Sequence, residues 1–213
     1  MSTVFQQDKA ASIKEAVELM AHRITEVLTT EITSQLIDND NICRISIEIP
    51  SQQLLTWLTT QKSSLKTYWS GRENKFEMAG IDAADYITNG NDLQHTKLFS
   101  QLHKRLESAH NDIRYFGGFK FALNQSDEKF WVPFGLCYFV LPRFELCKLS
   151  DKTYFVCNLL IDKDTGKLSS ILSRLKAINF QADIDMEIIP KIISRNDFPT
   201  KENWSEAVNS SFD

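Results

Sequence analysis

The sequence predicts an α+β fold in which mostly antiparallel strands carry flanking helices. Strand-like residue patterns are densest between residues 113 and 160, while apolar residues recur at helical spacing in several other segments. The chain has 213 residues, 42% of them hydrophobic and 24% charged. This composition is typical of a globular protein that is long enough to bury a sizeable core.

The helices are predicted from apolar residues three and four positions apart. Ile13, Val17, Met20 and Ile24 begin such a stripe, which predicts a long helix over residues 10–37 that ends at the turn-forming residues 38–41. We expect this stripe to pack against the protein's own sheet. Further helices are expected over residues 54–58, where Ser51 would be the cap, and over 92–109, 168–178 and 199–213.

The strands are predicted from residue alternation and turn residues. Residues 43–49 alternate strongly, and residues 65–69 and 76–80 form a hairpin around a turn at 71–74. Extended structure is expected over 114–121, 131–146 and 153–161. Gly117 and Gly118 lie inside one of these strands, which indicates a bulge or a close backbone approach.

Charge and cysteine usage exclude several classes of protein. The net charge is −4 and basic residues are scattered, so we expect no nucleic-acid partner. No apolar run is long enough to span a membrane, and residues 1–10 lack the apolar core of a secretory signal, which predicts a cytoplasmic protein. Cys43, Cys137, Cys147 and Cys157 lie in apolar runs without C-x-x-C spacing and are predicted to be buried, reduced thiols.

Two groups of residues have the spacing of metal ligands. His103, Glu107 and His110 fall on one side of a predicted helix, but a solvated helix face explains them better than a zinc site. Asp162 and Asp164 resemble the start of a calcium loop, yet Lys167 and Ser173 stand at the next two diagnostic positions. No phosphate-binding loop or nucleophile elbow is present. The residues themselves therefore indicate no catalytic, cofactor-binding or metal site.

Four segments resemble, in order, the chorismate-utilising enzymes and among them the isochorismate synthases. The first is Tyr68-Trp69-Ser70-Gly71-Arg72 with residues 77–83, where Asp82 stands at a position that is commonly glycine in the family. The second is the strand of residues 115–121, which contains the two adjacent glycines. The third combines residues 131–134 with the L-P-R stretch in residues 139–145, and the fourth is the helix of residues 199–208 with its tryptophan.

This resemblance implies the amino-terminal part of a two-sheet sandwich like that of anthranilate and aminodeoxychorismate synthases. Residues 1–198 would be a scaffold region, and 199–213 would start a helix that leads into the catalytic region. The family's catalytic lysine, in a K-V-V-L-A-R-like motif, and its later glutamates for acid catalysis and Mg²⁺ binding have no counterpart here. We therefore assign no catalytic, cofactor or metal residue to this chain.

The resemblance implies that the full-length parent enzyme uses chorismate as its substrate and Mg²⁺ as its cofactor. Its reaction would convert chorismate to isochorismate for menaquinone or siderophore biosynthesis. The fragment itself is expected to be inactive and to self-associate through an uncovered apolar face. Salicylate synthase is an alternative parent, whereas anthranilate-type enzymes often begin with an L-L-E-S-like segment that residues 53–56 match poorly. The other alternative is a non-catalytic binding or regulatory module from a split gene.

Overall fold

A computed structural model describes residues 8–29, 42–71, 75–89, 95–107, 112–120, 132–181 and 193–211. The chain divides into two compact units, Met1–Ala182 and Asp183–Asp213. The larger unit holds a sheet with its helices, and the smaller unit holds one helix. Each unit is described by itself.

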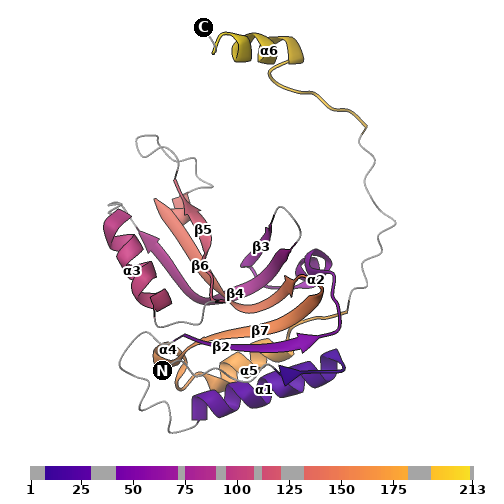
Figure 1. The fold of residues 1–213 in the computed structure, drawn as a ribbon, viewed down its shortest axis with the longest axis vertical. Coiled ribbons are helices and arrows are strands. Elements are labelled where there is room, and N and C mark those ends of the chain that lie inside the picture. The colour runs from indigo at the N-terminus through magenta and orange to yellow at the C-terminus, as the bar shows by residue number, and fades with distance from the viewer. Residues whose placement is uncertain are drawn as a thin grey trace. The chain divides into compact units, whose positions relative to one another are not determined.

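The larger unit is built on one seven-stranded sheet (Figure 1). The strands follow the order β1-β2-β7-β6-β4-β3, and β5 pairs with β6 beside this path. Only the pairing of β1 with β2 is parallel, which confirms the predicted mostly antiparallel α+β fold. The strands are β1 (Asp8–Lys9), β2 (Ile42–Ile49), β3 (Lys66–Ser70), β4 (Phe76–Asn89), β5 (Phe116–Phe119), β6 (Cys137–Leu149) and β7 (Lys152–Leu160).

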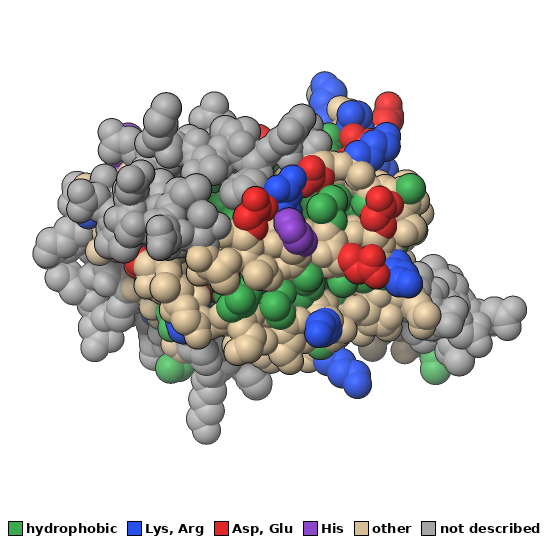
Figure 2. All heavy atoms as spheres, turned by 90° about the horizontal axis from the view of Figure 1, so that it is seen from below, with side chains coloured by type: hydrophobic (Ala, Val, Ile, Leu, Met, Phe, Trp, Pro, Cys, Tyr) green, Lys and Arg blue, Asp and Glu red, His purple; other side chains and the backbone are tan. Residues whose placement is uncertain are grey.

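Helices cover one face of the lower part of the sheet. The helices α1 (Ile13–Thr29) and α5 (Leu168–Lys176) lie side by side beneath β2 and β7 (Figure 1). The short helix α2 (Leu54–Thr60) packs on β4. Seen from its helical side, the described surface shows acidic and basic side chains interspersed with hydrophobic ones (Figure 2).

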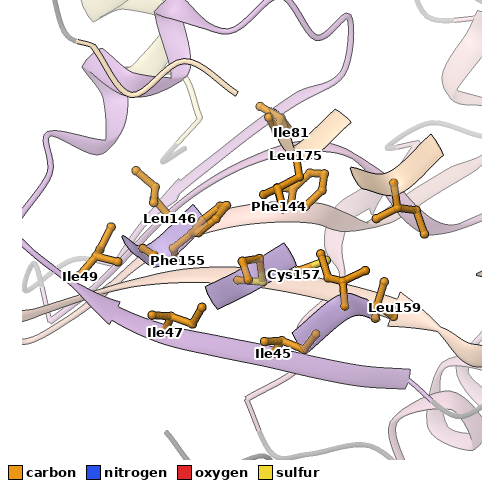
Figure 3. Close-up of a cluster of buried hydrophobic side chains, with 14 of the residues drawn as sticks. Ile45, Ile47, Ile49, Ile81, Phe144, Leu146, Phe155, Cys157, Leu159 and Leu175 are labelled. Atoms are coloured by element: carbon orange, nitrogen blue, oxygen red, sulfur yellow. The ribbon is translucent and has the colours of Figure 1, made fainter. Parts of the chain in front are cut away.

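The main core lies between these helices and the sheet. Side chains from four neighbouring strands point into it (Figure 3), and Met20 and Ile24 of α1 close it from the other side. Each fully buried aliphatic or aromatic side chain contributes roughly 1.5–3 kcal/mol to folding. The strand residues of this core are Ile45, Ile47, Ile49, Ala79, Ile81, Phe144, Leu146, Phe155, Cys157 and Leu159. They confirm the predicted alternation and the packing of the first helix on its own sheet.

A bulge in β4 changes which of its residues face this core. The register shifts between Ala83 and Asp85, next to Asp82, whose φ is +54°. Before the bulge the odd-numbered residues of β4 lie on the side of the sheet that α1 and α5 cover, and after it the even-numbered residues lie on that side, because Tyr86 pairs with Val140 and Thr88 with Tyr138. The helix α3 (His95–Glu107) packs on the opposite face of this upper part, through Leu98.

Three sequence-based boundaries were wrong. The strand predicted to end at residue 80 continues to Asn89, because the bulge absorbs the break in alternation. Val132–Phe134 form a 3-10 turn instead of extended structure. The helix at Leu54–Thr60 starts after Gln53 and has no side-chain cap, so Ser51 is not its cap. The first helix is confirmed over Ile13–Thr29, while residues 30–41 lie outside the described part.

The smaller unit contains the helix α6 (Lys201–Asn209), close to its predicted start. Thr200 caps it: the Asn203 backbone N–H donates to Thr200 Oγ1 at 3.3 Å. Trp204 is exposed, and no residue of α6 is buried. In the described parts of both units, none of the helices has the length and apolar character needed to cross a membrane.

Candidate functional site

Buried charged residues gather on the sheet face opposite the main core, where Arg44, Asn158 and Glu145 come from three adjacent strands. Arg44 Nη1 donates to Asn158 Oδ1 at 3.0 Å, and Arg44 Nη2 donates to Glu145 Oε2 at 3.0 Å. Asn158 Nδ2 in turn donates to Glu145 Oε1 at 2.6 Å. Burial lowers the pKa of Arg44, but the ion pair with Glu145 outweighs it and leaves that pKa above its ordinary value.

A second ion pair, between Arg143 and Asp164, lies next to the first group. Arg143 forms a bidentate contact with the Asp164 carboxylate, with Nη2 to Oδ1 at 2.9 Å, and Nη1 also donates to the Asn158 carbonyl oxygen at 2.8 Å. Asp164 ends the one-turn helix α4 (Ile161–Asp164) and accepts the Leu160 backbone N–H at 2.8 Å. Such bidentate geometry fixes both partners in place.

These five residues, which we call the buried polar network, are Arg44, Arg143, Glu145, Asn158 and Asp164. Two arginines balance two carboxylates, and each member bonds to another member. Both carboxylates are therefore already engaged by cations inside the protein. The arrangement ties β2, β6, β7 and α4 together.

A separate cluster surrounds Asp85 just above the bulge. The Asp85 carboxylate accepts the Tyr115 hydroxyl at 2.8 Å and the Lys163 ammonium at 2.8 Å, and it also contacts the Arg105 guanidinium. The four residues come from β4, α3, α4 and the segment before β5. Asp85 is buried, so the two cations compensate its desolvation and attach α3 and α4 to the sheet.

The first and third of the segments that resemble chorismate-utilising enzymes meet at the bend of β4 and β6. Gly80, from the first segment, lies against the Pro142 ring, so closely that an added Cβ would come within 2.6 Å of it. Pro142 and its neighbour Arg143 belong to the L-P-R stretch of the third segment. Asp82 adopts the left-handed backbone conformation that glycine favours. These motif residues shape the bend.

The cysteines are free thiols, and three of the four are buried. Burial raises the pKa of Cys43 to about 12 and that of Cys147 to about 11, and it also raises the pKa of Cys157. Thiols with raised pKa values are poor nucleophiles. These observations confirm the prediction of buried, free thiols for Cys137, Cys147 and Cys157, whereas Cys43 is only partly buried, and they argue against cysteine catalysis.

Of the two candidate metal groups, the structure describes the first only in part. His103 is exposed on α3, and the Glu107 side chain and His110 lie outside the described residues. Asp164 is bound by Arg143, so it is not available as a calcium ligand. Within the ranges described above, no three His, Cys, Asp or Glu side chains lie close enough together to hold a metal ion.

Sequence reasoning missed the buried polar network and the Asp85 cluster. A signal was present, because Arg143 and Glu145 interrupt an otherwise apolar strand. Their partners are far away in the chain, however: Arg44 and Glu145 are 101 residues apart. A shallow hollow on α3, lined by Phe99, Ser100, Leu102, His103 and Leu106, holds none of these charged groups.

Comparisons with known proteins agree with the fold. The family described as chorismate binding enzyme matches residues 26–213. The solved structure of MenF, the menaquinone-specific isochorismate synthase from Escherichia coli, is similar with a TM-score of 0.54 and 18% identity. The similarity covers 92% of this chain and 41% of that one, so the chain spans less than half of that enzyme's length. None of the curated proteins matches. Because the family match covers most of its length, the chain belongs to the chorismate binding enzyme family.

Proposed function

We propose that this chain is the amino-terminal portion of an isochorismate synthase and that it serves the enzyme as scaffold. The parent reaction converts chorismate to isochorismate with Mg²⁺, in the cytoplasm, for menaquinone or siderophore biosynthesis. The family match and the likeness of fold to an isochorismate synthase support this proposal. Residues 1–198 would form the scaffold, and 199–213 the start of the helix leading to the catalytic region.

One observation carries the scaffold role. The buried polar network lies beside the bend where the family-like motifs meet, and its two carboxylates are each engaged by an arginine, Glu145 by Arg44 and Asp164 by Arg143. A general base must be free to take a proton from water, and a metal ligand must present an open carboxylate. Glu145 and Asp164 instead hold strands and α4 in place, which is a structural role.

The sequence of the whole chain also supports a scaffold role. Attack of water on chorismate needs a general base, and the family's lysine motif for that role has no counterpart among the 213 residues. Chorismate also carries two carboxylates, which need Mg²⁺ or cationic side chains. The two arginines of the network are already paired within the protein.

The experiment is an assay of the purified chain with chorismate and Mg²⁺, followed by chromatographic separation of the products. We expect no isochorismate above the uncatalysed background, whereas the Escherichia coli isochorismate synthase in the same buffer serves as the positive control. Turnover by residues 1–213 alone would refute the scaffold role. Formation of salicylate would indicate a salicylate synthase instead.

A second experiment distinguishes the proposal from the alternative, a non-catalytic module from a split gene. Translation of the DNA that follows codon 213 should reveal the lysine motif and the later glutamates if the proposal holds. A stop codon at that point, with no partner gene that encodes those motifs, would favour the binding or regulatory module.

A further inference from the structure

The last described segment of the larger unit, residues 178–181, belongs to no helix or strand. It follows α5, which ends at Lys176 with Ala177 as its cap, and it comes just before Ala182, where the larger unit ends. We call these four residues the exit strap. Their attachment therefore determines where the chain leaves the larger unit.

The exit strap is hydrogen-bonded to the body of the larger unit through one side chain, that of Gln61. Gln61 Nε2 donates to the Asn179 carbonyl oxygen at 2.6 Å, and Gln61 Oε1 accepts the Asn179 backbone N–H at 3.1 Å. The side-chain amide thus pairs with both backbone groups of Asn179, as a neighbouring strand would. The other hydrogen bonds of these four residues, within the ranges described above, are local: the Ile178 N–H donates to the Leu175 carbonyl oxygen, and the Gln181 N–H donates to Asn179 Oδ1.

Gln61 is itself fixed in place at the end of α2, where it is the carboxy-terminal cap. Its Nε2 also donates to the Trp57 carbonyl oxygen at 2.7 Å, and the residue is only 6% exposed. A buried carboxamide needs its partners, because an unsatisfied donor or acceptor in the interior costs free energy. The bond to α2 therefore holds the Gln61 amide in the position where it meets Asn179.

Two apolar side chains of the exit strap complete its attachment. Phe180 packs edge-on against Phe155, a side chain of the main core (Figure 3), with 5.2 Å between ring centroids, and it lies tilted against Trp57 at 6.2 Å. Phe180 and Ile178 are only partly buried, whereas Phe155 and Trp57 are buried. The exit strap therefore covers the aromatic end of the main core from outside.

This mode of attachment makes the exit strap energetically separable from the sheet. A segment opens locally when its own contacts are lost, and the free energy of opening rises with the hydrogen bonds and buried apolar contacts that break. Opening of the exit strap breaks the two bonds to Gln61 and exposes two partly buried side chains. It leaves the seven strands paired, because the exit strap belongs to none of them.

We propose that the exit strap opens and closes over Trp57 and Phe155 while the sheet stays folded, and that Gln61 is the latch that holds it closed. Opening frees four more residues of the chain that follows α5, which adds up to about 14 Å to the reach of that chain. Gln61 thus controls how much chain is free after α5. The inference goes beyond the proposed function, because it involves neither chorismate nor Mg²⁺ and its test does not depend on turnover.

The first test is native-state hydrogen exchange of the full chain, followed by NMR at several low urea concentrations. Cys157 is the reference, because β7 pairs with a strand on each side of it and its amide exchanges through global unfolding. We expect the Asn179 amide to be protected, yet to exchange at least about tenfold faster than that of Cys157 and with little dependence on urea. Equal rates with equal urea dependence would overturn the proposal, because the exit strap would then open only when the whole unit unfolds. An Asn179 amide without protection would overturn it as well.

The second test compares Gln61→Met with Gln53→Met by the same method. Both changes replace the carboxamide with an apolar side chain of similar length, and Gln53 is the matched control at the other end of α2, where it is exposed and makes no side-chain cap bond. We expect Gln61→Met to accelerate exchange of the Ile178 amide about tenfold or more, because the two bonds that close the exit strap are lost. Ile178 N–H is not bonded to Gln61, so its exchange reports opening of the strap.

Gln53→Met should leave exchange of the Ile178 amide unchanged. Equal acceleration in the two variants, or none in Gln61→Met, would contradict the assignment of Gln61 as the latch. Acceleration of the Ile178 and Cys157 amides by the same factor would contradict it too, since it would reflect a loss of global stability.

Discussion

At the scale of single residues, the two adjacent glycines of β5 have different roles. A Cβ at Gly117 would come within 1.8 Å of the Tyr138 carbonyl oxygen, whereas a Cβ at Gly118 would meet nothing within 4 Å. The sequence indicated a close backbone approach for the pair but could not tell which glycine makes it. The approach is made by Gly117, because its added Cβ would collide with the backbone of β6.

Alanine substitutions test this difference directly. We expect Gly117→Ala to lower the free energy of unfolding by about 1–3 kcal/mol, since β5 would have to move away from β6. Gly118→Ala should leave it unchanged or raise it by about 0.4–1 kcal/mol, because alanine restricts the unfolded chain. Urea denaturation monitored by circular dichroism measures both. Equal losses for the two variants would contradict the assignment.

Asp82 combines an unusual backbone conformation with a side-chain hydrogen bond. Its φ of +54° is costly for most residues, and its side chain accepts the Ser63 hydroxyl at 2.7 Å. Aspartate tolerates this conformation better than alanine does, and glycine tolerates it best.

Two substitutions separate the backbone effect from the side-chain effect. Asp82→Ala and Asp82→Gly both remove the bond to Ser63, but only glycine relieves the left-handed conformation. We expect Asp82→Gly to be more stable than Asp82→Ala by about 1 kcal/mol in urea denaturation. If Asp82→Ala were instead the more stable variant, the positive φ at this position would not be a source of instability.

At the scale of elements, alternation predicted the strands well but not what their polar residues contact. Arg143 and Glu145 are visibly out of place in an apolar strand, so burial with partners could be expected from the sequence. Asp164 was interpreted as part of a turn, and nothing local indicates that it pairs with an arginine 21 residues earlier. Antiparallel pairing of β6 with β7 creates this contact, and such pairing is a property of the whole sheet.

The coupling between Arg143 and Asp164 can be measured with a double-mutant cycle. Arg143→Met leaves a buried carboxylate without its cation and should cost about 3–5 kcal/mol of unfolding free energy. Asp164→Asn keeps an acceptor for the Leu160 N–H, and in the double variant we expect a loss smaller than the sum of the single losses. Glu18→Gln, in an exposed pair with Lys14 at 4.0 Å, is the control and should change stability by less than about 0.5 kcal/mol. Additive losses would contradict a direct interaction.

The buried thiols of the sheet predict a dependence of stability on alkaline pH. Burial raises the pKa of Cys147 to about 11 and that of Cys43 to about 12, from an ordinary value of 9.0. The unfolded chain therefore loses these protons first as the pH rises above 9, which favours unfolding. Each thiol contributes at most about 1.4 kcal/mol per pH unit to the decline, up to its folded pKa.

Cys43→Ala isolates this contribution. Its free energy of unfolding should fall less steeply than that of the wild type between about pH 9 and pH 11, although its value at neutral pH is lower or unchanged. Urea denaturation at each pH gives the two slopes, and lysine and tyrosine ionisation cancels in their difference. Parallel slopes would show that Cys43 titrates normally in the folded protein.

At the scale of the whole molecule, the fold class could be predicted from patterns in the sequence, whereas the bend of the sheet could not. Alternation in β2, the apolar runs of β6 and β7 and the stripe of α1 predict a helix-covered sheet. The bulge at Ala83–Asp85 reverses the alternation of β4, so the sequence pattern does not show that the strand continues past it.

Because the chain divides into two units, we expect the larger unit to be as stable alone as it is in the full chain. Residues 183–213 form a separate compact unit, and α6 within it buries none of its residues, although Trp204 and Val208 give it an apolar side. A helix that buries no side chain contributes little to stability, because tertiary packing supplies most of the stability of helices in proteins. Residues 1–182 alone should therefore unfold within about 0.5 kcal/mol of the full chain in urea, with the same dependence on urea concentration. A marked loss of stability on truncation would show that α6 is part of the fold of the larger unit.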